Sequence, residues 1–197
     1  RICLNNPQAL TPIGARPTLA SCAMGEVCAH TLLEHGEAAT RAVVANVCDD
    51  SLERVVEANT LLSGIGFESG GLALAHPMAL AFTQIDRIHH NYLHGEMVAM
   101  GTLIQLVMEA SKDADKIARF FARVGLPIHM DQLSLSPTAT DALNTIIEFA
   151  LKNKNAHYMP MAVTAASLRE AMLKANDLGM KISAELGDDA YRRMHGL

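Results

Sequence analysis

The chain has 197 residues, of which 50% are hydrophobic and 19% are charged. This composition is typical of an ordered globular protein and excludes a disordered one. The formal net charge is −5 and no basic patch is present, which argues against nucleic acid as a partner.

Residues 1–17 are expected to be an irregular lead-in, because helix-breaking residues recur there. Thr18 is a candidate N-cap for a helix that runs to about residue 35 and ends at Gly36. A second helix is expected over residues 37–48.

A third helix is predicted to begin at Asp50 or Ser51. One stripe of this helix is apolar except for one asparagine, and its members are Leu52, Val55, Val56, Asn59 and Leu62. Four glycines between residues 64 and 71 then interrupt the helical pattern. Glycines allow a backbone to come close to a neighbouring helix or to a ligand.

Two apolar segments follow, residues 72–82 and 96–109, separated by a polar, turn-like stretch over residues 84–91. The second segment is predicted to be a helix buried nearly all round, as at the centre of a bundle. Neither segment is long enough to span a membrane. Residues 1–7 have no sustained apolar core of a signal peptide, so we expect a cytoplasmic protein.

The remaining helices are expected to be amphipathic. The first covers residues 113–124 and is closed by the Gly-Leu-Pro sequence at 125–127, a helix-stop signal. A connector with a short helix follows over residues 128–137. Further helices are predicted over 138–152 and 164–178, with Thr138 and Thr164 as N-caps, and a polar tail ends the chain.

This pattern predicts an all-α fold of seven or eight helices in one domain, residues 1–197. The four cysteines have no CxxC spacing and are expected to be free, mostly buried thiols: Cys3, Cys22, Cys28 and Cys48.

Histidines supply the clearest candidate chemistry. Four of the 9 histidines lie between residues 76 and 94: His76, His89, His90 and His94. Imidazoles from the ends of two adjacent helices can bind a metal ion, and a catalytic zinc commonly has three protein ligands and one open position. The alternative is that His76 is a hydrogen-bonded core residue and that the adjacent pair is solvated. Candidates for a third ligand are Glu68, Asp86 and Glu96, and none is favoured.

Nucleotide-binding signatures are absent. The chain has no GxGxxG after a strand, no GxxxxGK[ST] and no GxSxG. The residue pattern by itself therefore indicates a helical domain with a candidate two-histidine metal site and no visible cofactor-binding module.

Two motifs resemble those of a known family. Residues 63–76 (SGIGFESGGLALAH) and 90–106 (HNYLHGEMVAMGTLIQL) are similar to consecutive motifs of the glycerol dehydrogenases, in the metal-dependent polyol branch of the iron-containing alcohol dehydrogenase superfamily. Residues 124–128 (VGLPI) and 157–160 (HYMP) follow in the family's order. The resemblance covers nearly the whole chain from about residue 19.

The resemblance implies a two-domain enzyme of which this chain is most of the C-terminal helical domain. Such enzymes oxidise glycerol to dihydroxyacetone with NAD at one catalytic zinc. The resemblance assigns His76 and His94 as two zinc ligands, and it implies a homo-oligomer. The third ligand, an aspartate in a GDALA-type motif, and the NAD-binding domain would lie upstream of Arg1, so this fragment alone is expected to be inactive.

The resemblance also assigns Phe67 to a position close to substrate and gives His90 a polar or proton-relay role. The chain departs from the family at two positions. Ala79 stands where the family often has a second histidine, and Pro77 stands where it more usually has a small residue.

Two other functions remain open. The chain is alternatively a stand-alone, catalytically inactive helical domain, derived from a dehydrogenase, that acts in binding or assembly. A third alternative is a dehydrogenase for a phosphorylated glycerol or another small polyol, for which Arg87 is the candidate basic residue.

Overall fold

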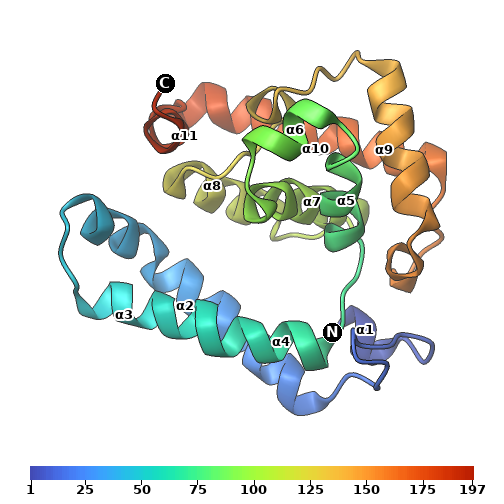
Figure 1. Ribbon diagram of the computed structural model, residues 1–197, viewed down its shortest axis with the longest axis horizontal. Coiled ribbons are helices and arrows are strands. Elements are labelled where there is room, and N and C mark those ends of the chain that lie inside the picture. Colours follow the sequence, from blue (N-terminus) through green and yellow to red (C-terminus); the bar gives the residue numbers. More distant parts are fainter. The chain divides into compact units, whose positions relative to one another are not determined.

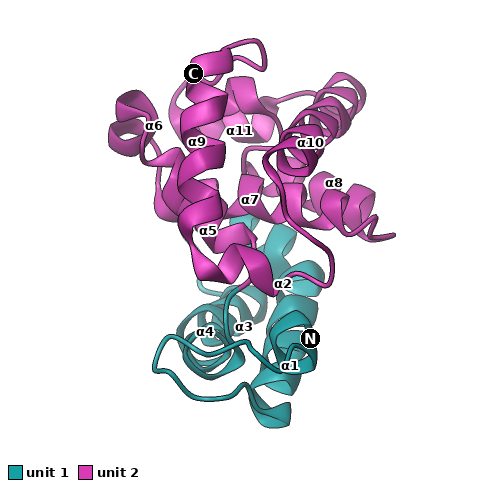
Figure 2. Cartoon of the chain, turned by 90° about the vertical axis from the view of Figure 1, so that its right-hand side faces the viewer, with its two compact units in different colours: residues 1–72 teal, residues 73–197 magenta.

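The computed structural model describes residues 1–197, of which 72% are helical and none forms a strand (Figure 1). The predicted all-α fold class is confirmed. The chain divides into two compact units, Arg1–Leu72 and Ala73–Leu197 (Figure 2). The expectation of one domain over residues 1–197 stays a prediction. No helix has both the length and the apolar content that a bilayer span needs.

Unit 1 is a pair of long helical segments that pack along one another. After one turn of helix, α1 (Ile2–Asn5), the chain forms α2 (Leu19–Val44). The returning segment comprises α3 (Asp50–Glu57), a π-helical turn (Ala58–Leu62) and α4 (Ser63–Gly70), and all three contact α2.

The start of α2 agrees with prediction. The backbone N–H of Ser21 donates to Oγ1 of Thr18 at 3.1 Å, and the N–H of Thr18 donates to Oγ of Ser21 at 3.3 Å. The predicted end at Gly36 was wrong, because α2 continues through this buried glycine to Val44. Glycine in a helix costs about 1 kcal/mol relative to alanine, and the packing of α2 against α3 offsets this cost.

The glycine-rich segment is helical, contrary to the predicted interruption. Gly66 and Gly70 lie where α4 comes close to α2, one of the two roles considered. A Cβ atom on Gly66 would lie 3.7 Å from the Cα of Gly25 on α2. The hydroxyl of Ser21 donates to the carbonyl oxygen of Ser69 at 2.7 Å. Gly71, with φ of +81°, ends the helix in a conformation that favours glycine.

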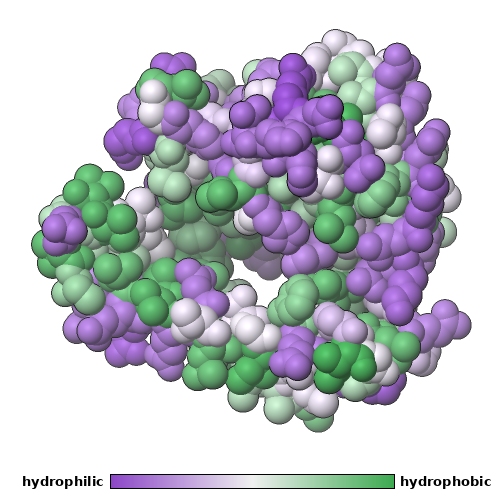
Figure 3. Space-filling model, in the orientation of Figure 1, coloured by the Kyte–Doolittle hydropathy of each residue, from purple (hydrophilic) through white to green (hydrophobic).

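Unit 1 exposes many apolar side chains. Around the connection between α2 and α3, Val43, Val44 and Val47 are exposed, and Figure 3 shows hydrophobic residues at the surface in this region. The predicted apolar stripe of the third helix is only half-buried, and its Val56 and Asn59 are exposed. All four cysteines are free, as expected, but only Cys3 and Cys28 are buried.

Unit 2 is built around one central helix, α7 (His94–Met108). The helices α5 (Ala75–Phe82), α8 (Ala114–Val124) and α10 (Ala165–Leu186) contact it. No residue from 96 to 109 is exposed, which confirms the predicted central helix. The remaining elements are α6 (Asp86–Asn91), α9 (Thr140–Lys152), α11 (Asp189–His195) and two 3₁₀ helices, Met130–Leu133 and Lys154–Tyr158. The stretch predicted as a polar turn thus contains the short helix α6.

Two predicted helix ends in unit 2 are confirmed. Gly125 closes α8 with φ of +85°, and Thr164 forms a reciprocal capping box with Ser167 at the start of α10. The predicted cap at Thr138 was wrong. The N-cap position is Ala139, and the hydroxyl of Thr138 pairs instead with that of Ser136 at 2.9 Å.

The predicted end of the last long helix at residue 178 was also wrong. The helix α10 continues through Gly179 to Leu186, and α11 follows within the predicted polar tail. A Cβ atom on Gly179 would lie 1.8 Å from the carbonyl oxygen of Ile128. This glycine therefore permits close packing inside a helix instead of ending it.

Candidate metal centre

His76 and His94 lie next to one another in unit 2. Their ring centroids are 5.8 Å apart and their planes are tilted by 51°. His76 is in the first turn of α5, and His94 is the first residue of α7. Two imidazoles that bind one zinc at about 2.0 Å have ring centroids roughly 5–6 Å apart. The observed separation therefore fits two ligands of one metal ion.

The position of His76 is set by the residue before it, Ala75. The backbone N–H of Ala75 has no acceptor within its own helix, and it donates to Oε1 of Gln105 on α7 at 2.9 Å. The carbonyl oxygen of Ala75 lies so close to Gly101 that a Cβ atom there would be 2.4 Å away. Both contacts hold the start of α5 against α7.

The two departures from the family pattern fit the first turns of α5. Pro77 is buried at the third position of the helix, where the missing N–H costs no intrahelical hydrogen bond. Ala79 is fully buried in the core of unit 2.

A carboxylate in the first turn of α7 caps the helix that begins at His94. Oε2 of Glu96 accepts a hydrogen bond from the backbone N–H of Leu93 at 2.7 Å. Its other oxygen, Oε1, lies 2.8 Å from Nε2 of His195 on α11. Sequence reasoning considered Glu96 only as a metal ligand and missed this role. The signal was available, since a glutamate three residues after an N-cap often reaches back to it.

The surroundings of His76 favour its neutral imidazole. Burial lowers the pKa of His76, and the nearby His94 lowers it further. A metal ion binds the deprotonated imidazole nitrogen. The pKa shift of His76 therefore reduces competition from protons at neutral pH.

A third ligand does not join the pair within residues 1–197. No group of three or more His, Cys, Asp or Glu side chains is placed to hold a metal ion. Of the candidates from the sequence, Glu96 is engaged with Leu93 and His195, Asp86 begins α6, and Glu68 lies in unit 1 on α4. The histidines fit two positions of a three-ligand zinc set.

The other two candidate residues lie elsewhere. His90 is exposed on α6, where its Nδ1 donates to the carbonyl oxygen of Asp86 at 2.8 Å and its ring meets His89 edge-on at 5.0 Å. Phe67 is on α4 in unit 1 and is 47% exposed. Arg87, the candidate for phosphate recognition, is also exposed on α6.

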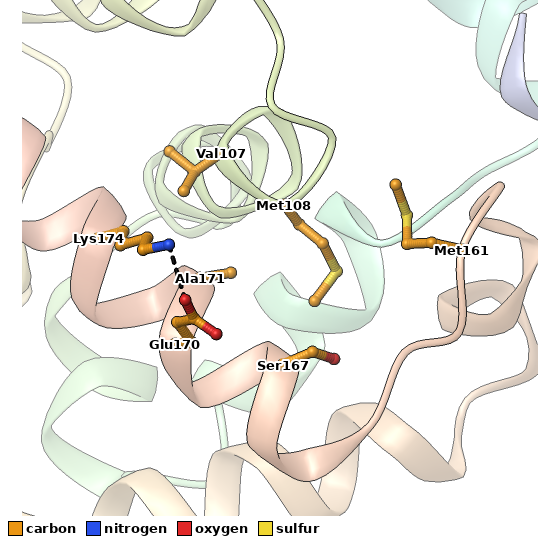
Figure 4. A pocket seen from close by; sticks show the side chains of 7 residues that line it. All are labelled: Val107, Met108, Met161, Ser167, Glu170, Ala171 and Lys174. Carbon is orange, nitrogen blue, oxygen red and sulfur yellow. Dashed lines mark ion pairs between the residues drawn. The ribbon is translucent and has the colours of Figure 1, made fainter.

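A pocket of about 190 Å³ lies at the far end of α7 (Figure 4). It is lined by Val107 and Met108 of α7, Met161, and residues of α10 that include the ion pair between Glu170 and Lys174 at 2.7 Å. Val107 and Met108 are separated from His94 by about 20 Å of helix at 1.5 Å per residue, and neither His76 nor His94 lines the pocket. The pocket is therefore not part of the histidine site.

Curated proteins and solved structures similar to this chain include glycerol dehydrogenases. No protein-family model matches the chain. The chain is 41% identical over 180 residues to the glycerol dehydrogenase of Escherichia coli O6:H1. This match covers 90% of this chain and 49% of that protein. It is 38% identical over 173 residues to the glycolaldehyde reductase of Halobacterium salinarum, covering 86% of this chain and 47% of the reductase.

A solved structure shares the fold. The crystal structure of glycerol dehydrogenase from Schizosaccharomyces pombe matches with a TM-score of 0.82 and 31% identity, over 91% of this chain and 47% of that one. The chain thus spans about half the length of the relatives it matches.

Proposed function

This chain belongs to the glycerol dehydrogenase family, and we propose that the complete protein containing it oxidises glycerol to dihydroxyacetone with NAD as the hydride acceptor. The observation that carries the proposal is the approach of the two family-motif histidines, His76 and His94, to 5.8 Å. The names of the relatives support glycerol as the substrate.

In this proposal His76 and His94 bind a catalytic zinc as two of its three protein ligands. Zinc, when bound, supplies Lewis-acid polarisation of a substrate hydroxyl and lowers its pKa. The chain's contribution is to hold both imidazoles in place, through Ala75 for His76 and through Glu96 for His94.

His90 and Phe67 receive supporting roles. Because a carbonyl oxygen only accepts, the Nδ1 of His90 carries the proton in its bond to Asp86. In the neutral ring, Nε2 is then free to take up a proton, which fits the proton-relay role. Phe67 keeps the substrate-contact role that the family resemblance gives it, and its aromatic ring is half-exposed.

Residues 1–197 alone are proposed to be inactive, because they supply two zinc ligands and no recognisable nucleotide loop. NAD is held mainly by another part of the protein. The complete enzyme is proposed to be a cytoplasmic homo-oligomer.

The test is the complete protein assayed for NADH formation from glycerol. We expect turnover that a chelator abolishes and zinc restores, with elemental analysis separating zinc from iron. Glycolaldehyde with NADH and glycerol phosphate with NAD are the comparison substrates, and faster turnover of either would replace glycerol as the substrate. Absence of any NAD-dependent turnover would overturn the proposal.

The intact mass of the polypeptide from its source separates this function from the alternative. A mass about twice that of residues 1–197 supports an enzyme in which these residues form one part. A mass equal to this chain would overturn the enzyme reading and favour a stand-alone binding domain.

A further inference from the structure

Glu96 and His195 form a contact that the proposed reaction does not use. Nε2 of His195 lies 2.8 Å from Oε1 of Glu96, and the exposed fractions of the two side chains are 20% and 12%. The N–H of His195 is not aligned on that oxygen, so the contact is a close polar approach and not a well-formed hydrogen bond. It joins the first turn of α7 to the last residue of α11, within unit 2.

His195 is itself held by aromatic side chains. Its ring centroid lies 4.3 Å from that of Tyr191 and 5.8 Å from that of Tyr92. The hydroxyl of Tyr191 donates to the carbonyl oxygen of Gln132, and burial raises the pKa of this tyrosine, which keeps it a donor. The hydroxyl of Tyr92 pairs with Oγ of Ser134 at 2.7 Å. His195 therefore presents a fixed partner to Glu96.

The carboxylate of Glu96 also contacts Leu93, the residue directly before His94. While Oε1 of Glu96 faces His195, Oε2 accepts the backbone N–H of Leu93 at 2.7 Å. Leu93 directly precedes His94. The buried side chain of Glu96 thus connects α11 to the backbone at Leu93, immediately before α7 begins at His94.

We propose that Glu96 and His195 are positioning residues for His94 and that they set the affinity of the histidine pair for zinc. This inference rests on the proposed function. A buried carboxylate oxygen without a polar partner is costly, so loss of His195 would leave Oε1 unpartnered and draw Glu96 toward solvent. Release of Glu96 would loosen the cap at Leu93. A metal site depends on ligands held within about 0.5 Å of the required positions.

The experiment measures zinc affinity of the complete protein by competition with a chromophoric chelator. The variant His195→Phe keeps a ring against Tyr191 and removes the polar partner of Glu96. We expect it to weaken zinc binding by about tenfold, the lower end of the effect of outer-shell residues. His195→Gln retains an N–H donor and should stay within about threefold of the wild type.

Two further variants separate positioning from general stability. His30 and Glu34 form an exposed His–Glu pair at 3.6 Å on α2, so His30→Phe is the matched control and should leave zinc affinity unchanged. Glu96→Gln keeps the acceptor for Leu93 but weakens the contact with His195, and it should reproduce the effect of His195→Phe. The visible spectrum of the cobalt-substituted protein should change in both variants, whereas the melting temperature should change little.

Failure of the positioning role and failure of the proposed metal site give different results in these experiments. If His76→Ala leaves zinc binding intact, the proposed metal site itself is wrong. If His76→Ala abolishes zinc binding while His195→Phe and Glu96→Gln bind zinc as the wild type does, the positioning role is overturned. A fall in affinity that parallels the loss of melting temperature, with an unchanged cobalt spectrum, also overturns it.

Discussion

Gly101 of α7 lies against the carbonyl oxygen of Ala75, the first residue of α5, where a Cβ atom would come within 2.4 Å. One turn further along α7, Gln105 accepts the backbone N–H of the same alanine. Since His76 follows Ala75 directly and His94 begins α7, these two contacts determine how far apart the two histidines lie.

Gly101→Ala should destabilise the protein and disturb the histidine pair. The added methyl group would meet backbone, which cannot rotate away, so α5 would have to shift. We expect a loss of about 1–3 kcal/mol in the free energy of unfolding, measured by urea denaturation, and weaker zinc binding. Gly64→Ala is the control, because its Cβ would point into open space within α4. Its expected effect is a stabilisation of up to about 1 kcal/mol.

Gln105→Leu should leave the backbone N–H of Ala75 without its acceptor. We expect a cost of about 1–3 kcal/mol, again by urea denaturation. Gln105→Glu retains an acceptor oxygen at the N-terminal end of α5, where a negative charge is favourable, and should remain close to the wild type. Equal stability of the leucine variant and the wild type would show that this hydrogen bond does not hold α5.

His76→Ala and His94→Ala should each remove most of the zinc from the complete protein. Each variant deletes one of two imidazoles that lie 5.8 Å apart, and a site that loses one ligand of three binds zinc weakly. Zinc content per chain after gel filtration is the measurement. His89→Ala, in the same histidine-rich stretch but exposed on α6, should retain the metal. Full zinc content in either of the first two variants would contradict the assignment.

Acid should destabilise unit 2 through His129. This side chain is 6% exposed, and neither ring nitrogen has a hydrogen-bond partner. Burial lowers its pKa, although Asp188 and Asp131 act in the opposite direction. Between the lowered folded-state pKa and the unfolded value of about 6.5, only the unfolded chain binds the proton. The stability from neutral His129 is therefore present above about pH 6.5 and is lost as the pH falls through the folded-state pKa.

The measurement is the free energy of unfolding between neutral and mildly acidic pH. His129→Phe removes the titrating group and should flatten the dependence. Part of the slope should remain, because burial also lowers the pKa of His76. An unchanged slope in His129→Phe would assign the acid sensitivity to other groups.

Local signals in the sequence predicted the all-α fold, the caps at Thr18 and Thr164, the stop at Gly125 and the buried central helix. These features depend on neighbours within one helical turn, so a short stretch of sequence contains them. The family motifs also selected His76 and His94, although spacing alone did not bring them together.

Other features depended on residues far away along the chain. Gly36 and Gly179 carry the same local signal as Gly125, yet both are buried inside helices. Gly179 lies against the carbonyl oxygen of Ile128, a contact that no local pattern predicts. The approach of His76 to His94 follows from packing at Ala75, and the contact of Glu96 with His195 joins α7 to α11, which are far apart in the sequence. Periodicity and capping act over single turns, whereas close packing between helices decides which side chains meet.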